Sequence, residues 1–180
     1  MGIGHTRWAT HGEPSDVNSH PHTNVSGDIA VVHNGIIENY MKLKDWLQGK
    51  GVQFVSETDT EVIAHLVNYY YRGNLLDAVL ETLKRIEGSY ALGVVCRNNP
   101  GELIAARKDS PLVVGLGKGE NYIASDIPAI LEHTRDVFLL EDREVAVIRK
   151  DRIDIYDEEG EPVQKGVFHV SWDVTAAEKG

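Results

Sequence analysis

The chain has 180 residues, of which 42% are hydrophobic and 26% charged, and this balance predicts one packed domain rather than a disordered chain. The net charge of -10 argues against a nucleic-acid-binding or anionic-membrane-binding surface, because phosphate recognition needs clustered lysine and arginine. No apolar run is long enough to cross a bilayer. The single cysteine, Cys96, excludes an internal disulfide. It suits the reducing cytoplasm, where we expect the protein to act.

The first part of the chain predicts a strand followed by a helix. Residues 1–27 are irregular and rich in Gly, His, Pro, Asn and Ser, and residues 28–33 form a short apolar run that predicts a buried strand. Apolar residues then recur at helical spacing over residues 36–47. The Asn34-Gly35 pair is therefore expected at a strand-to-helix junction.

Two further helices are predicted in the middle of the chain. Residues 52–55 predict a short strand ahead of them. Thr58 and Glu61 have the spacing of a capping box, which predicts that a helix begins there. The next helix is expected to begin near Asn74 and to end at Gly88.

The second half of the chain has the pattern of strands and turns. Short runs predict strands at residues 89–97, 102–107, 111–116, 122–125, 137–140, 144–149 and 152–156. A short helix is expected over 126–131, and the last three strands are expected to form a meander. Residues 115–119, Gly-Leu-Gly-Lys-Gly, predict a hairpin turn rather than a phosphate-binding loop, because no helical pattern follows them. Mixed α and β structure is expected, with antiparallel strands dominating this half.

Histidines are concentrated at the start of the chain. Five of the eight fall within the first 33 residues: His5, His11, His20, His22 and His33. Neutral imidazole is a good zinc ligand, so a metal site is one interpretation. Loop histidines also commonly hydrogen-bond to backbone carbonyls, and neither added cysteines nor an HExxH spacing supports a metal here. We therefore expect neither a metal nor another cofactor.

The stretch HTRWATHGEP at residues 5–14 concentrates side chains suited to binding. Arg7 lies beside Trp8, and a guanidinium can donate two parallel hydrogen bonds to a carboxylate. Thr10 and His11 would add further donors. The alternative is a surface arginine stacked on an indole, which is a common arrangement.

Later positions extend this candidate site. Asn34 and Gly35 would offer a carboxamide and a backbone N–H to a developing negative charge, aided by a helix N-terminus, unless the pair is simply a turn that needs glycine. Asp59 would bind an ammonium group, unless it is only the acidic residue of a helix's first turn. A cation, an oxyanion donor and an anion together fit a zwitterionic amino acid with a side-chain carbonyl.

The same motifs resemble one known family. They are HTRWATHGEP at 5–14, NSHPH at 18–22, HNGIIEN at 33–39, SETDTE at 56–61, SPLVVGLG at 110–117 and IASD at 123–126. In order and spacing they resemble the glutaminase domain, a type 2 glutamine amidotransferase, of the glucosamine-6-phosphate synthases, or isomerizing glutamine:fructose-6-phosphate aminotransferases. The resemblance implies an N-terminal-nucleophile hydrolase fold. This is an α+β, four-layer α/β/β/α sandwich with antiparallel sheets, here lacking its first strands.

The resemblance also implies roles for the candidate residues. Arg7 would hold the α-carboxylate of glutamine, and Asp59 would hold its α-ammonium group. Asn34 and Gly35 would form the oxyanion hole. The remaining candidates are Thr10 and His11, beside the carboxylate, and Trp8, near the route by which ammonia leaves.

One requirement of the family is not met by the sequence. The family's nucleophile is a cysteine at the mature N-terminus, whose own α-amine acts as general base. Met1-Gly2-Ile3-Gly4 aligns well inside that domain, and Cys96 aligns with no catalytic position. We therefore expect residues 1–180 to be a partial glutaminase domain without the isomerase domains, and to show no glutaminase turnover.

The expected partners follow from the resemblance. They are L-glutamine and L-glutamate, the missing N-terminal segment and the sugar-phosphate isomerase domains of the parent, with a homodimer left open. Neither nucleic acid nor a membrane is expected as a partner. The rival interpretations are a non-catalytic amino-acid-binding module or truncated paralogue, and a histidine-based metalloprotein.

Overall fold

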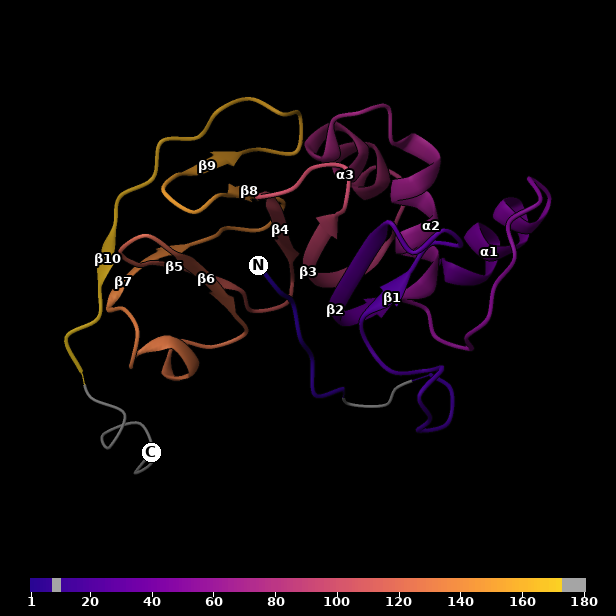
Figure 1. Ribbon diagram of the computed structural model, residues 1–180, viewed down its shortest axis with the longest axis horizontal. Coiled ribbons are helices and arrows are strands. Elements are labelled where there is room, and N and C mark those ends of the chain that lie inside the picture. Colours follow the sequence, from indigo (N-terminus) through magenta and orange to yellow (C-terminus); the bar gives the residue numbers. More distant parts are fainter. Residues whose placement is uncertain (8–10, 173–180) are drawn as a thin grey trace.

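The computed structural model describes residues 1–7 and 11–172. In this part of the chain two antiparallel β-sheets pack against each other, and three α-helices cover the outer face of the larger sheet (Figure 1). The helices are α1 (Tyr40–Gln48), α2 (Glu61–Tyr70) and α3 (Leu75–Leu83), and a short 3-10 helix, η1 (Pro128–Ile130), follows later. Within the described ranges, none of the helices is long and apolar enough to span a membrane.

The larger sheet has six strands in the order β1-β2-β3-β4-β8-β9. They are β1 (His22–Thr23), β2 (Ile29–Ile37), β3 (Gly88–Cys96), β4 (Leu103–Lys108), β8 (Val145–Ile148) and β9 (Ile153–Tyr156). The smaller sheet has the order β10-β7-β5-β6. Its strands are β5 (Val113–Leu116), β6 (Asn121–Ala124), β7 (Asp136–Leu139) and β10 (Phe168–His169).

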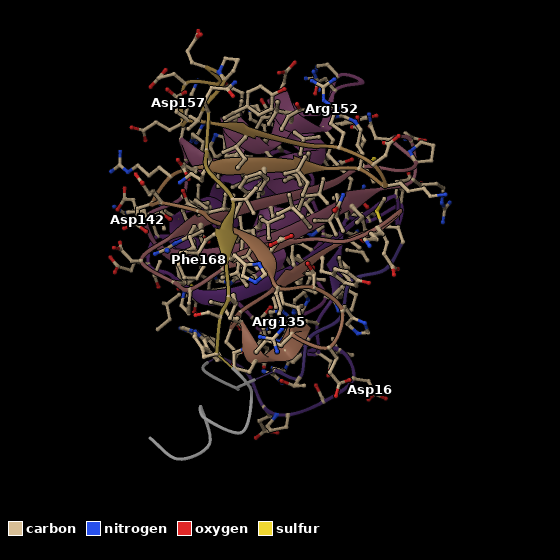
Figure 2. All side chains as sticks on the ribbon, turned by 90° about the vertical axis from the view of Figure 1, so that its left-hand side faces the viewer. Asp16, Arg135, Asp142, Arg152, Asp157 and Phe168 are labelled. Atoms are coloured by element: carbon tan, nitrogen blue, oxygen red, sulfur yellow. The ribbon has the colours of Figure 1, made fainter. Side chains whose placement is uncertain are left out.

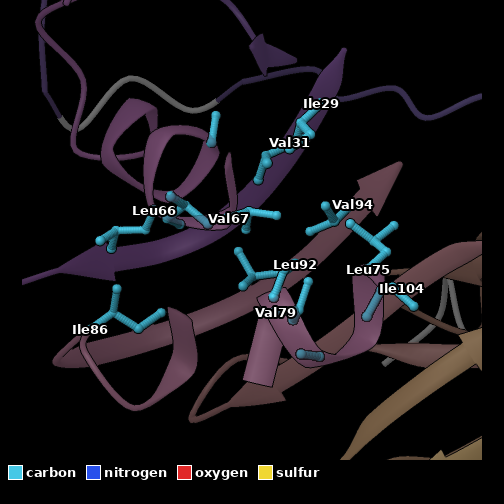
Figure 3. Close-up of a cluster of buried hydrophobic side chains, with 14 of the residues drawn as sticks. Ile29, Val31, Leu66, Val67, Leu75, Val79, Ile86, Leu92, Val94 and Ile104 are labelled. Atoms are coloured by element: carbon cyan, nitrogen blue, oxygen red, sulfur yellow. The ribbon is translucent and has the colours of Figure 1, made fainter. Parts of the chain in front are cut away.

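The central strands β3 and β4 of the larger sheet are largely buried on both faces, which explains why β3 is almost continuously apolar in sequence. Leu92 and Val94 of β3 face the helices and pack with Leu66 of α2 (Figure 3). Ala91 faces the other way and packs with Val114 of β5 in the cluster between the sheets. Successive side chains of one strand thus belong to two different cores.

The outer face of the smaller sheet carries only a short helical cover in the described residues. Val113 and Val137 point to this face and pack with Ile130 and Leu131, at and just after η1. The layers are therefore helices, sheet, sheet and a helical turn. This is the α+β sandwich of antiparallel sheets that the resemblance implies, with its last layer reduced to one turn.

The two ends of the described chain take different positions on the sheets. Residues 1–4 run between them (Figure 1), and Ile3 packs on the cluster between the sheets. The C-terminal segment runs along the edge of the smaller sheet, with Phe168 at the surface (Figure 2). Arg135 holds this segment, because its guanidinium donates to the carbonyls of Val170 and Trp172 at 3.2 and 2.8 Å.

The strand-to-helix junction expected at Asn34-Gly35 is wrong. β2 continues through both residues to Ile37, and α1 begins only at Tyr40. The physical reason is non-local: β3 offers a pairing partner for every residue from Ile29 to Ile37. Ile36, which was expected on the buried side of a helix, is instead 42% exposed on the strand.

The expectations for residues 52–61 are also corrected. Residues 52–55 do not form a strand, because the backbone N–H of Val55 donates to the Glu61 carboxylate rather than to a neighbouring strand. The capping box does not form either. α2 begins at Glu61 with Thr60 as its N-cap, and the Thr58 hydroxyl bonds to side chains instead of capping the helix.

In the second half of the chain the predicted strands are confirmed, but the way in which three of them pair is not. The strands from β3 to β9 lie within two residues of their expected positions. A hairpin turn is confirmed between β5 and β6, but it consists of residues 117–120, because Gly115 and Leu116 still pair within β5. α3 ends at Leu83 rather than at Gly88, which begins β3. The three-strand meander is wrong, because β7 belongs to the smaller sheet and only β8 and β9 pair with each other.

Candidate functional site

A polar pocket of about 300 Å³ lies beside β2, between the N-terminal segment and the loop that precedes α2. Its lining includes five of the predicted site residues: Arg7, His11, Asn34, Gly35 and Asp59. Trp8 and Thr10, the other two, lie outside the described residues. Segments that are distant in sequence therefore bring the predicted cation, anion and oxyanion donors to one cavity.

A larger pocket of about 570 Å³ lies beside residues 1–4 and contains none of the predicted site residues. It is lined by backbone, by apolar side chains such as Leu103 and Ile123, and by a few polar groups at strand ends. Volume by itself therefore does not identify the site. The smaller pocket is the better candidate, because charged and hydrogen-bonding groups converge on it.

The edge of β2 forms one wall of the candidate pocket. β1 pairs only with Ala30 and Val31, so beyond this point the outer edge of β2 is met by side chains. The N–H of His33 donates to His20 Nδ1 at 3.2 Å, and the N–H of Ile37 donates to Asp59 Oδ2 at 2.8 Å. Gly35 lies between these two residues on β2 and lines the pocket.

Gly35 is required by the backbone at this point. Its φ is +121°, and an added Cβ would lie 2.3 Å from the carbonyl oxygen of Ser89 on β3. The expected oxyanion donor therefore belongs to a bent strand edge. A helix N-terminus was also expected to assist this donor. That expectation is wrong, because α1 begins only at Tyr40.

Asn34 is held by a residue that sequence reasoning did not single out. Its Oδ1 lies 2.5 Å from Nε2 of His5, and Nδ1 of His5 accepts the backbone N–H of Arg7 at 2.9 Å. In sequence, His5 was one of five histidines considered for a metal. Its position two residues before Arg7 was the signal that could have marked it.

Arg7 organises the loop that follows it. Its guanidinium donates to the backbone carbonyls of His11, Gly12 and Glu13 at 2.8, 3.1 and 3.2 Å. Its φ of +54° is in the left-handed region, which is uncommon for a residue with a side chain. The half-buried positive charge lines the pocket, so a carboxylate is the ligand group that it suits.

Asp59 presents a buried carboxylate to the pocket. It is 3% exposed, and the Ile37 N–H fixes its Oδ2. Its Oδ1 lies 3.9 Å from Nδ1 of His11, which is beyond hydrogen-bond range. A capping box starting at Thr58 would place Asp59 in the first turn of the helix. In the structure Asp59 instead precedes Thr60, the N-cap of α2. A buried carboxylate with one oxygen toward a cavity suits an ammonium ligand.

The residues that flank Asp59 are fixed by histidines. Thr58 Oγ1 lies 3.0 Å from His22 Nε2, and Thr60 Oγ1 lies 2.9 Å from His33 Nδ1. Burial lowers the pKa of both imidazoles, so they are neutral near neutral pH. The loop is thereby tied to both β1 and β2.

Glu61 anchors the other side of the same loop. Its carboxylate accepts the backbone N–H groups of Val55 and Ser56 at 2.9 and 2.7 Å, and His65 Nε2 lies 3.1 Å away. Burial by itself would raise the pKa of Glu61, but the hydrogen bonds from His65, Ser56 and Val55 lower it to about 2. Glu61 therefore remains ionised and holds the segment that carries Asp59.

His20 supports one face of the pocket beside His5. The rings of His5 and His20 stack at 4.3 Å between centroids, with 19° between their planes. Burial, followed by the charges of neighbouring His5 and His22, lowers the pKa of His20 to about 3. Among residues 1–7 and 11–172, no group of three or more His, Cys, Asp or Glu side chains is arranged to hold a metal ion.

Cys96 lies away from this pocket. It is the last residue of β3, is 5% exposed, and belongs to the core between the larger sheet and the helices. Cys96 is therefore a buried thiol of this core.

Comparisons with known proteins give the family. A model of the glutamine amidotransferase domain matches residues 5–132. The whole chain is 64% identical to the isomerizing glutamine–fructose-6-phosphate aminotransferase of Clostridium perfringens, and 54% identical to that of Thermus thermophilus. In both comparisons it spans only 30% of the relative's length.

Solved structures agree with this assignment. The glutamine phosphoribosylpyrophosphate amidotransferase of B. subtilis, complexed with ADP and GMP, superposes with a TM-score of 0.71 at 27% identity over 86% of this chain and 34% of that one. An allosteric regulatory enzyme of purine biosynthesis superposes with a TM-score of 0.66 at 26% identity, over 78% of this chain and 31% of that one. The N-terminal-nucleophile hydrolase fold and the resemblance read from the motifs are confirmed. The chain belongs to the glutamine amidotransferase domain family.

Proposed function

We propose that the pocket beside β2 binds L-glutamine, and its product L-glutamate, as part of an isomerizing glutamine:fructose-6-phosphate aminotransferase. The observation that carries the proposal is the convergence of Arg7, Asp59 and the Asn34-Gly35 pair on one cavity. A pocket of about 300 Å³ lies at the small end of the range for ligand sites, which suits an amino acid.

Each end of glutamine has a matching group in this proposal. The α-carboxylate lies against the Arg7 guanidinium, with His11 and Thr10 beside it, and the α-ammonium lies against Asp59. The side-chain carbonyl accepts from the Asn34 carboxamide and the Gly35 N–H. During hydrolysis these two donors stabilise the oxyanion that forms when a nucleophile attacks that carbonyl. Trp8 is proposed to lie near the route by which ammonia leaves.

The nucleophile is proposed to come from outside these residues. Cys96 is the one cysteine in the sequence, and its burial in the helix-side core keeps it from the pocket. We expect the 180-residue chain to bind glutamine without turning it over, which is also what the amino-acid-binding interpretation requires. Glutamate release above a buffer blank, retained in Cys96→Ala, would contradict this.

The larger context is also a proposal. This chain matches 30% of the length of its Clostridium perfringens relative. The rest of that length has room for the sugar-phosphate isomerase domains that would use the ammonia. In the parent protein we propose transfer of the glutamine amide nitrogen to fructose 6-phosphate, to give glucosamine 6-phosphate. We place this activity in the cytoplasm and leave open whether the protein forms a homodimer.

Calorimetric titration with L-glutamine tests the binding proposal. We expect saturable binding to the unmodified chain, and its loss in Arg7→Gln because the α-carboxylate loses its charged partner. Arg72→Gln is the matched control, since Arg72 is exposed and its guanidinium donates to the carbonyls of Tyr69 and Tyr71, away from the pocket. Equal glutamine affinity in both variants would contradict the proposal.

A further inference from the structure

His5 lies at the junction of two candidate binding groups. Its Nε2 is 2.5 Å from Asn34 Oδ1, and its Nδ1 accepts the backbone N–H of Arg7 at 2.9 Å. One imidazole therefore contacts the side chain proposed for the oxyanion hole and the backbone of the residue proposed for the α-carboxylate. The pairing joins residues 29 positions apart in sequence.

These two contacts fix the tautomer of His5. A neutral imidazole has one donor nitrogen and one acceptor nitrogen. Because a backbone N–H can only donate, Nδ1 is the acceptor, and Nε2 carries the hydrogen that is donated to Asn34 Oδ1. With its oxygen engaged in this way, the Asn34 carboxamide directs its NH2 group elsewhere. A flipped carboxamide would present an oxygen instead, which would repel an oxyanion.

The ring of His5 is itself held in place. It stacks on His20 at 4.3 Å between centroids, and His20 Nδ1 accepts the N–H of His33 from β2 at 3.2 Å. β2 therefore holds the imidazole from two positions, through Asn34 directly and through His20. A side chain fixed at both ring nitrogens and on one face has little freedom to release Asn34.

We propose that His5 is a positioning residue that orients the Asn34 carboxamide as a hydrogen-bond donor toward the side-chain carbonyl of a bound amino acid. The identity of the ligand rests on the proposed function. The orientation of Asn34 does not, since it is a property of the unliganded chain.

Two conservative variants separate the contacts of His5. His5→Gln places an NH2 group near the position of Nε2 and retains a donor for Asn34. His5→Asn places an oxygen near the position of Nδ1, so it retains the acceptor for the Arg7 N–H but loses the bond to Asn34. Circular dichroism checks that both variants fold.

Nuclear magnetic resonance of the unliganded, ¹⁵N-labelled chain gives the first readout. We expect His5 in the Nε2–H tautomer. We expect the Asn34 side-chain NH2 signals, assigned by their loss in Asn34→Asp, to shift in His5→Asn and to stay near their original positions in His5→Gln. An Nδ1–H tautomer, or Asn34 signals that do not move in His5→Asn, would overturn the proposal whether or not glutamine binds.

Binding selectivity gives the second readout. L-norvaline carries the same α-groups as glutamine but has a methyl group in place of the carboxamide. We expect the preference for glutamine over norvaline to fall about fivefold in His5→Asn, which is the effect of one lost hydrogen bond, and to be retained in His5→Gln. Equal weakening of both ligands in His5→Asn would overturn the proposal. If the unmodified chain binds neither ligand, the proposed function fails, and the spectra alone support or overturn the orientation of Asn34.

Discussion

The helix-covered face of the six-stranded sheet and the pocket wall along β2 share the same strand but are built differently. On the helix side, Ile29 and Val31 of β2 join an aliphatic cluster that is held by burial. Further along the same strand, the side chains of His33 and Asn34 are held by directional hydrogen bonds to residues of other segments. Burial of apolar side chains mainly sets stability, whereas directional bonds set the positions of binding groups. Substitutions in the two regions should therefore fail in different ways.

The largest effect on stability is expected in the helix-side core. Leu92 is 1% exposed, and Leu92→Ala should lower the free energy of unfolding by about 2–5 kcal/mol through lost burial and a residual cavity. Urea denaturation measures this. Leu139→Ala is the control with the same chemical change, and because Leu139 is 41% exposed its effect should stay within about 0.5 kcal/mol. Similar losses in both variants would remove the distinction between core and surface.

Gly35→Ala should damage both stability and binding. The added Cβ would lie 2.3 Å from the Ser89 carbonyl, at a φ of +121°, so β2 must move away from β3 and carry the Gly35 N–H with it. We expect a loss of about 3 kcal/mol of unfolding free energy and no measurable glutamine binding. Gly73→Ala is the control: its φ is +102°, but nothing lies within 4 Å of the added Cβ. It should cost only backbone strain, about 1–3 kcal/mol, and leave binding intact.

Asp59→Asn should affect binding more than stability. The asparagine oxygen can still accept the Ile37 N–H, but the negative charge proposed to hold the α-ammonium is lost. We expect glutamine affinity to fall by about 1.5–3 kcal/mol, measured by calorimetry, since this is the range for a hydrogen bond to a charged group. Asp45→Asn, on the exposed side of α1, should bind glutamine as the unmodified chain does.

The smallest effect is expected from acid acting on His20. Burial is the main reason that the pKa of His20 is lowered from 6.5 to about 3. In the unfolded chain His20 takes up a proton below pH 6.5. In the folded chain it stays neutral down to about pH 3. Because only the unfolded chain binds this proton, the free energy of unfolding falls as the pH decreases from 6.5 to about 3. The pKa of Glu61 is lowered from 4.5 to about 2, so its contribution is lost only below pH 4.5.

Urea denaturation at a series of pH values tests this order. His20→Asn retains an oxygen near the position of Nδ1, which can accept the His33 N–H. We expect this variant to lose about 1 kcal/mol of the change in unfolding free energy between pH 6.5 and 4.5. This value is reduced because the ring is partly exposed to solvent. Glu61→Gln should act mainly below pH 4.5, with a smaller change above it because the charge of Glu61 raises the pKa of His22. If the free energy of unfolding of His20→Asn changes with pH between 6.5 and 4.5 as it does in the unmodified chain, His20 is not the group that titrates there.

By itself the sequence determined the features that depend on residue type and local spacing. The apolar runs predicted the strands from β3 to β9, because burial imposes that pattern directly on the chain. The motif residues Arg7, Asn34 and Asp59 were likewise recognisable by their types, and the structure brings them to one pocket.

The tertiary structure decided what depends on pairing between distant segments. Local spacing favoured a helix after residue 35, but the register of β2 with β3 extends the strand to Ile37 and places Gly35 at its bent edge. Local spacing also favoured a capping box at residues 58–61, but Glu61 bonds to Val55 and Ser56 instead. The bond between His5 and Asn34 has no local signature at all, because the two residues meet only when the N-terminal segment lies against β2. Hydrogen bonds across such separations follow from the completed fold, which no window of neighbouring residues contains.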